Sequence, residues 1–214
     1  MKRVFMLALL ATMTGVAVNA QASLKDVFAN KETPLFYYGI DFTNIKVIDD
    51  AAINAEDVVS RQFNGINDVV VNEPKKYTIA EAFRKKELNH DLSFVSDRNK
   101  TVDPKKLNST TASDFERLSQ KDIEATVAKL KTGTNSGVGL VIVAEALSKG
   151  KKAMAVWVTF IDSKTKKVLY TERMEAKMST AFSLRNQWAS CIKNLIDDID
   201  KKKFKEWKKK FAAE

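Results

Sequence analysis

One cysteine and one histidine are available for nucleophilic chemistry in this chain of 214 residues. A thiol nucleophile needs a nearby base, and a histidine is the usual partner. His90 lies in a polar stretch, far from Cys191 in the sequence. We therefore expect no Cys–His dyad and interpret Cys191 as a small, buried apolar residue.

Acidic residues offer a second kind of chemistry. Asp41 is the only acidic residue in a stretch of large apolar residues, and Glu145 lies late in another apolar run. Two carboxylates about 5 to 10 Å apart in an open cleft can hydrolyse glycosidic bonds, so one hypothesis is a hydrolytic or glycan-binding site around Asp41 and Glu145. The structural alternative is an ion pair inside the fold, and we expect Asp41 to pair with Arg185.

Glu145 and Glu172 fall on strands that we expect to be neighbours, where they could form a carboxylate pair or bind a metal ion. A calcium or magnesium site needs several further oxygen ligands, and no stretch of the sequence has the spacing of a calcium-binding loop. We therefore expect neither a metal site nor a cofactor.

The carboxy-terminal segment combines basic and aromatic residues. Residues 201–210 hold seven lysines and one glutamate, and contribute +6 to the formal charge of +9. Phe204, Trp207 and Phe211 recur at helical spacing and continue an earlier apolar stripe after a one-residue slip. We consider three hypotheses: a solvated helix end whose lysines complement the helix dipole, a helix that docks on its own domain or on a partner, and an anionic membrane-surface helix over 201–211. Without Lys2 and Arg3 of the amino terminus, the rest of the chain is nearly neutral, so we do not expect a nucleic-acid partner.

The amino terminus has the pattern of a secretory signal. Residues 1–3 are basic or Met, 4–18 are apolar, and 20–22 supply a small-x-small cleavage pattern. An apolar run of about 15 residues is shorter than the roughly 20 that span a bilayer. We predict a signal peptide over 1–22 and one domain over 23–214. No cysteine lies at the cleavage point, so we expect a soluble periplasmic or secreted protein rather than a lipid-anchored one.

Apolar patterns of period two predict the strands. The first covers 35–48, with its even-numbered apolar residues from Phe36 to Phe42 on one face and a bulge or strand end near Thr43. A short edge strand is expected at 91–96. Three later runs, joined by short polar turns, predict an antiparallel meander: 138–147, 153–161 and 167–178.

Helical spacing and capping residues predict about four helices. They begin near Asn54, at the capping box Thr78-x-x-Glu81, at the capping box Ser113-x-x-Glu116 and near Asn186. The third is expected over 114–131 and the fourth over 186–210. Helices interleaved with strands indicate an α/β (α+β) sandwich: a mixed sheet with a three-strand antiparallel meander in the carboxy-terminal half, packed by these helices.

Part of the chain resembles a family of uncharacterised exported proteins of Gram-negative bacteria. The resemblance covers 137–174 and 182–199, without the glycines that the family usually has at 179–183, and rests on matching positions: Glu145, Asp162, Thr165, Phe182, Arg185, Asn186, Trp188 and Ala189. The order of elements is more distantly similar to the amino-terminal domain of TolB and the periplasmic domain of the curli secretion channel lipoprotein. That similarity implies a non-enzymatic envelope module that binds other proteins.

We therefore predict a non-catalytic exported protein that acts as a protein-binding module in the periplasm. The third meander strand is charged on both faces from Glu172 to Lys177 and leads into the segment 182–189. We expect the interaction surface there and on the last helix, with these members: Arg173, Phe182, Arg185, Asn186, Phe204, Trp207 and Phe211.

Overall fold

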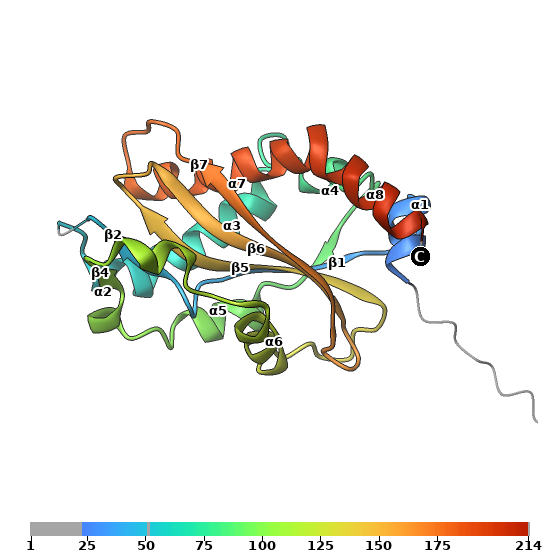
Figure 1. Cartoon of the computed structure of the whole chain (residues 1–214), viewed down its shortest axis with the longest axis horizontal. Helices are drawn as coiled ribbons and strands as arrows, with labels where there is room; N and C mark the ends of the chain where they lie inside the picture. Colours follow the sequence, from blue (N-terminus) through green and yellow to red (C-terminus); the bar gives the residue numbers. More distant parts are fainter. Residues whose placement is uncertain (1–22, 51, 214) are drawn as a thin grey trace, which may run out of the picture.

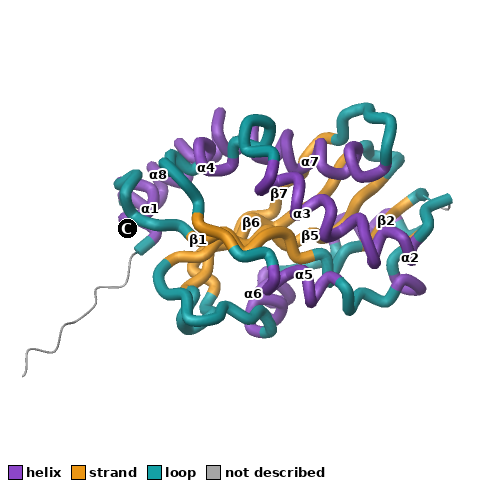
Figure 2. The backbone as a smooth tube through the Cα atoms, turned by 180° about the vertical axis from the view of Figure 1, so that it is seen from behind, coloured by secondary structure: helices purple, strands orange, loops and turns teal. Residues whose placement is uncertain are grey.

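The computed structural model describes residues 23–50 and 52–213 (Figure 1). The predicted signal peptide, residues 1–22, lies outside these ranges. One mixed sheet separates two layers of helices, as both views of the backbone show (Figures 1 and 2). The predicted class, a mixed α/β fold, is confirmed at this level.

The sheet contains seven strands, and four of its six pairings are parallel. In parallel orientation, β1 (Phe36–Asp41) and β2 (Lys46–Ile48) both lie along β5 (Val138–Ser148), while β3 (Asn89–His90) pairs with β1 and β4 (Asn108–Ser109) pairs with β2. The antiparallel strands are β6 (Ala153–Asp162), which pairs with β5, and β7 (Val168–Lys177), which pairs with β6. Antiparallel pairing is confined to β5, β6 and β7. The other strands pair in parallel and come from segments distant in sequence, so the sheet as a whole is not an antiparallel meander.

The first strand changes face at Gly39, where its register against β5 shifts. Gly39 has a φ of 101°, which a residue with a side chain rarely adopts. As a result Phe36 and Tyr38 pack beside one group of helices, whereas Ile40 and Phe42 join the main core on the other face. The single apolar stripe expected from period two is therefore wrong.

The strand end expected near Thr43 is confirmed, because a turn separates β1 from β2. The edge strand expected at 91–96 is wrong. The short strand β3 ends just before this range, and the helix α5 (Ser93–Asn99) occupies most of it. The Asp91 side chain accepts a hydrogen bond from the Ser93 backbone N–H at 2.9 Å, which favours a helix start at this point.

The larger core lies on the face of the sheet that carries α7 and α8, which run along the top of Figure 1. The helices that contribute to it are α1 (Leu24–Ala29), α2 (Ala55–Asp57), α3 (Phe63–Asn72), α4 (Ile79–Ala82), α7 (Leu184–Asp198) and α8 (Phe204–Ala212). The π-helical turns η1 (Val58–Gln62) and η4 (Ile199–Lys203) join α2 to α3 and α7 to α8. The expected slip in the last apolar stripe lies at η4, since a π turn holds one extra residue. The eight α-helical segments of the described residues exceed the four expected.

The opposite face is covered by α5, α6 (Gln120–Ala128) and the 3₁₀ turn η3 (Ala112–Glu116), while a second 3₁₀ turn, η2 (Pro104–Lys106), precedes β4. The long helix expected over 114–131 is wrong at its start. Its capping box is formed by Ser119 and Asp122 rather than by Ser113 and Glu116. At α4, Thr78 makes no capping hydrogen bond.

Candidate binding surface

Asp41 is buried at the carboxyl end of β1, and its partner is Arg98 rather than Arg185. Its Oδ2 accepts from Arg98 Nε at 2.8 Å, and its Oδ1 accepts from the Thr43 backbone N–H at 2.8 Å. Arg185 instead donates to Gln62 Oε1 at 3.0 Å. The predicted pair is wrong because α5 continues past the expected strand to Asn99 and brings Arg98 over the end of β1.

Glu145 is fully buried on the helix-covered face that carries α6 and η3. It lies at a bulge of β5 and accepts from the Leu118 backbone N–H at 2.6 Å, Trp157 Nε1 at 3.1 Å and Arg173 Nε at 2.8 Å. With three hydrogen-bond donors, one of them Arg173, the carboxylate of Glu145 has a structural role as part of a buried ion pair. Because Asp41 and Glu145 are 1% and 0% exposed, they do not form the open acidic cleft of the glycan hypothesis.

Glu172 points to the other face of the sheet, since side chains alternate along a strand and the next residue of β7 is the one that reaches Glu145. Glu145 and Glu172 therefore do not form the carboxylate pair that their positions in the sequence had left possible. Glu172 accepts from Lys203 Nζ at 2.7 Å, Trp207 Nε1 at 2.6 Å and Tyr170 OH at 2.8 Å. Burial alone would raise the pKa of Glu172, but these three donors outweigh it and lower the pKa below its ordinary value.

The thiol and the imidazole lie in different surroundings. Cys191 is buried in α7, and burial raises the pKa of its thiol to about 12. His90 is exposed on β3, with Nδ1 at 3.4 Å from the Leu88 carbonyl oxygen. A thiol that stays protonated is a poor nucleophile. Among residues 23–50 and 52–213, no group of three or more His, Cys, Asp or Glu side chains could hold a metal ion.

The aromatic residues of α8 face inward. Phe204, Trp207 and Phe211 are 8%, 1% and 2% exposed. Phe28 of α1 contacts all three, with ring centroids 5.3, 6.1 and 5.2 Å away, and Phe160 of β6 meets Trp207 edge-on at 5.6 Å. The helix therefore docks on its own domain. These three side chains do not belong to a surface that a partner can reach, which corrects our prediction.

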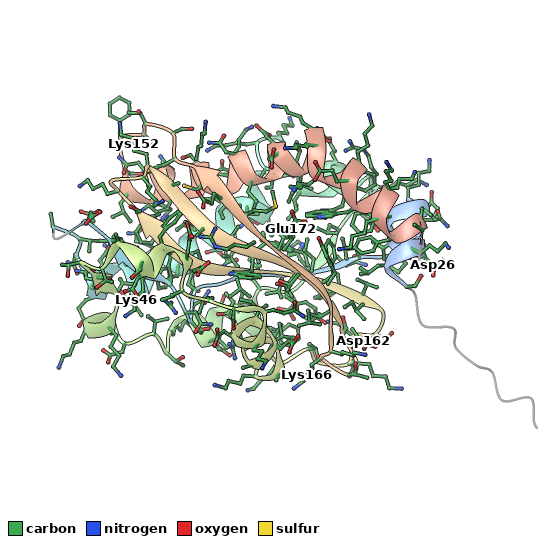
Figure 3. The ribbon with its side chains drawn as sticks, viewed as in Figure 1. Asp26, Lys46, Lys152, Asp162, Lys166 and Glu172 are labelled. Carbon is green, nitrogen blue, oxygen red and sulfur yellow. The ribbon has the colours of Figure 1, made fainter. Side chains whose placement is uncertain are left out.

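Once the aromatic stripe is buried, the lysines of η4 and α8 are left on the outside. We call the lysine face the five exposed lysines that have no ion-pair or cation–π partner among the described residues: Lys201, Lys202, Lys205, Lys208 and Lys209. Two other lysines of this segment have local partners. Lys203 turns toward Glu172 and Glu206, and Lys210 Nζ lies 4.1 Å from the centroid of the Tyr170 ring. Figure 3 shows Glu172 on the side of the sheet that the α7–α8 helix covers.

The other predicted surface residues are scattered. Arg173 points inward to Glu145, and Arg185 is half-buried. Phe182 and Asn186 are exposed at the start of α7. A helix that continues from there to the end of α8 is on the order of 40 Å long at 1.5 Å per residue. The seven predicted residues therefore do not form one surface.

No known protein family model matches the chain, and no curated protein sequence is significantly similar to it. Within the described residues, no helix has the length and apolar character needed to cross a membrane. The lysine face is thus a candidate binding site that we infer from the structure of this chain alone.

Proposed function

We propose that the protein is a non-catalytic, exported module that associates with an anionic membrane surface through the lysine face. The observation that carries this proposal is the separation of the two sides of α8. Its aromatic side is buried in the domain, and its lysine side is exposed.

The five lysines of the lysine face outnumber their acidic neighbours on the same helix, which include Asp198, Asp200 and Glu206. Glu206 is paired with Lys203 at 2.8 Å, and Asp200 is paired with Arg84. Within α8, Lys205 lies near both Lys208 and Lys209 at helical spacings of three and four residues, and such like-charge pairs destabilise a helix by about 0.2 to 0.5 kcal/mol each. Lys209 also lies in the last turn of α8, where the negative end of the helix dipole favours a cation by about 0.3 to 1 kcal/mol. The two effects offset each other, so the fold gains little stability from the lysine face.

The composition of the face favours lipid headgroups over a protein partner. Protein interfaces are depleted in lysine and enriched in arginine and aromatic residues, and the aromatic residues of α8 are already used inside the fold. Lysines near an anionic bilayer contribute about 1 kcal/mol each. With no apolar side chain to insert, the association is electrostatic and reversible, and it weakens as salt increases.

Co-sedimentation with vesicles tests this function. The double variant K205Q/K209Q removes two positive charges from the lysine face, and K164Q/K167Q removes two from the β6–β7 turn, which lies at the lower edge of Figure 3 beside the labelled Lys166. We expect binding to phosphatidylglycerol vesicles at low salt, weakened about 30-fold by K205Q/K209Q, from about 1 kcal/mol per lysine. The turn variant should bind nearly as wild type.

Two outcomes would reject the membrane role: no binding of the wild-type protein to anionic vesicles at low salt, or equal weakening by the two double variants. Neutral phosphatidylcholine vesicles serve as the control for apolar adsorption. Deletion of residues 201–214 is unsuitable, because it would remove Phe204, Trp207 and Phe211 from the core.

Phe182 supports a second proposal, the protein-binding role implied by the resemblance. Its side chain is fully exposed in the loop before α7. An exposed aromatic side chain is a common anchor in protein interfaces. Site-specific photocrosslinking in cells from position 182, compared with position 164, should give a discrete crosslinked protein at 182 alone. Equal or absent crosslinking at both positions would reject this role.

A further inference from the structure

A polar hollow of about 470 Å³ lies beyond the carboxyl end of β1. The helices α5 and α6 lie on this face of the sheet (Figure 2). Its volume falls within the range of sites for small ligands. Ligands of α/β proteins commonly bind at the carboxyl ends of parallel strands, and β1 is parallel to both of its neighbours. Three positively charged side chains line the hollow: Arg98, Arg117 and Lys129.

Arg98 is held in place by the protein. Besides the bond to Asp41, its Nη2 lies 3.3 Å from Thr43 Oγ1 and 3.4 Å from the Thr126 carbonyl oxygen. Only 18% of its side chain is exposed. These contacts involve Nε and Nη2, and Nη1 has no hydrogen-bond partner among the described residues. One edge of a fixed guanidinium is therefore available to a ligand.

Arg117 faces the hollow from the loop between η3 and α6. One of its terminal nitrogens donates to the Asn44 carbonyl oxygen. Its Nε is buried and has no hydrogen-bond partner within the described part of the chain. A buried donor without an acceptor costs about 1 to 3 kcal/mol, and few such groups occur in native proteins. Because this atom is out of contact with solvent, a ligand oxygen satisfies it only after a small turn of the guanidinium toward the hollow.

The charges around the hollow leave a positive excess. Asp41 lies outside the lining and pairs with Arg98, and Asp122 is the one acidic residue in the lining. Hydrogen bonds from the Ser119 hydroxyl and backbone N–H lower the pKa of Asp122, so it stays ionised at neutral pH. Lys129 is exposed and forms no ion pair with a described residue. Three cations against two carboxylates leave one net positive charge.

The rest of the lining is mostly polar and ordered by hydrogen bonds. Asn44 Nδ2 donates to Thr126 Oγ1 at 2.7 Å, and Thr101 Oγ1 donates to the Arg98 carbonyl oxygen at 2.7 Å. Hydroxyl and amide groups of this kind can bind the hydroxyls of a ligand. The lining thus offers guanidinium and ammonium donors beside neutral polar groups.

We propose that this hollow binds a small oxyanion carried on a hydroxylated body, with Arg98, Arg117 and Lys129 around the anionic group. Arginine presents paired donors that match carboxylate and phosphate oxygens. Asp122 beside these cations disfavours highly charged ligands and favours a monoester or a single carboxylate. The proposal is independent of the membrane association, which involves the opposite face of the sheet.

Titration with glycerol 3-phosphate and with glycerate separates the two anionic groups on one body. We expect at least one to bind saturably with a Kd of about 1 mM or lower, whereas neutral glycerol does not bind. In ¹⁵N-correlated NMR spectra, the Arg117 Nε–H resonance should shift with the same saturation curve. If neither anion saturates at low ionic strength, or if the Arg117 signal stays unchanged while others move, the site is wrong.

Matched variants test the assigned residues. K129Q should weaken binding about tenfold, the scale of one charge-assisted hydrogen bond. R117K should have a similar effect, because lysine keeps the charge but lacks the paired N–H donors of the guanidinium. K121Q is the control, since Lys121 is an exposed residue of α6 outside the lining. Unfolding midpoints confirm that each variant is folded. Equal affinities of K129Q and K121Q, or wild-type affinity in both K129Q and R117K, would overturn the assignment.

Discussion

Replacing Glu172 by glutamine tests how the last helix is held on the sheet. The carboxylate of Glu172 is the common acceptor for Lys203 Nζ, Trp207 Nε1 and Tyr170 OH, at 2.6 to 2.8 Å. Glutamine has nearly the same shape, so it creates no cavity. Its amide oxygen can still accept from the indole and the phenol, but its NH₂ group then meets the ammonium of Lys203.

The expected loss follows from these contacts. A hydrogen bond to a charged group contributes about 1.5 to 3 kcal/mol, and the side chains of Glu172 and Lys203 are 24% and 20% exposed, which places the loss near the lower end. Lys203 also keeps Glu206. We expect E172Q to lower the free energy of unfolding by about 2 kcal/mol. For a domain of this size, that is a decrease of about 4 to 8 °C in Tm.

The loss should depend on pH in a defined direction. Three hydrogen bonds, despite burial, lower the pKa of Glu172 in the folded state. A carboxyl group whose pKa falls on folding contributes stability above the pKa of the unfolded chain, about 4.3 for glutamate. That contribution is lost as the pH falls through the lower folded-state pKa. The difference between wild type and E172Q should thus be constant from about pH 6 to 8 and shrink below about pH 4.5.

Urea unfolding followed by tryptophan fluorescence measures both effects. E206Q is the control, because Glu206 is the more exposed partner of Lys203 and such pairs contribute about 0.2 to 1 kcal/mol. A loss in E172Q no larger than that in E206Q, or a loss that does not change in acid, would refute the anchoring role of Glu172.

Two further predictions concern single positions. Gly39→Ala should destabilise the fold by about 2 to 4 kcal/mol, because a Cβ there would lie 2.8 Å from Asn67 Oδ1 and the φ is unfavourable for alanine. Gly137→Ala is the control, since Gly137 also has a positive φ but a Cβ there would meet nothing within 4 Å, and it should cost clearly less. Equal losses of the two variants in urea unfolding would refute the steric reason. Cys191, whose pKa burial raises to about 12, should react with a thiol reagent at pH 8 only on unfolding, and fast labelling of the native protein would contradict its burial.

Local patterns were sufficient for part of the fold. The signals for the runs that form β5, β6 and β7 lie within each run and in the polar turns between them, as at Asp162, whose Oδ1 accepts from the backbone N–H groups of Lys164 and Thr165 at 2.8 Å. The parallel pairing of β1 with β5 joins segments about 100 residues apart, and no local pattern reports such a contact. A glycine inside a strand pattern often marks a bulge, but the even-numbered apolar residues continue across Gly39, so the bulge there was missed.

The candidate binding surface on α8 could also be predicted only in part from the sequence. Helical spacing placed Phe204, Trp207 and Phe211 on one stripe, but only the fold shows that Phe28, from the other end of the chain, covers it. The partner of Asp41 was missed because Arg98 lies in a polar segment whose helix depends on its contacts with β1. The hollow beside it had no sequence signal, since its lining comes from four separate segments.

The two sides of α8 contribute unequally to stability, which makes the role of the lysines testable apart from folding. Phe204, Trp207 and Phe211 stabilise the domain by burial. Lys205 is repelled by Lys208 and Lys209 at helical spacing, and the helix dipole offsets this repulsion in the last turn. Lysines that served solubility alone would be spread over the surface, but ten residues hold +6 of the formal +9. Neutral substitutions on this side should therefore leave stability unchanged or raise it while they weaken binding, and a side of the helix that served only the fold would not behave in this way.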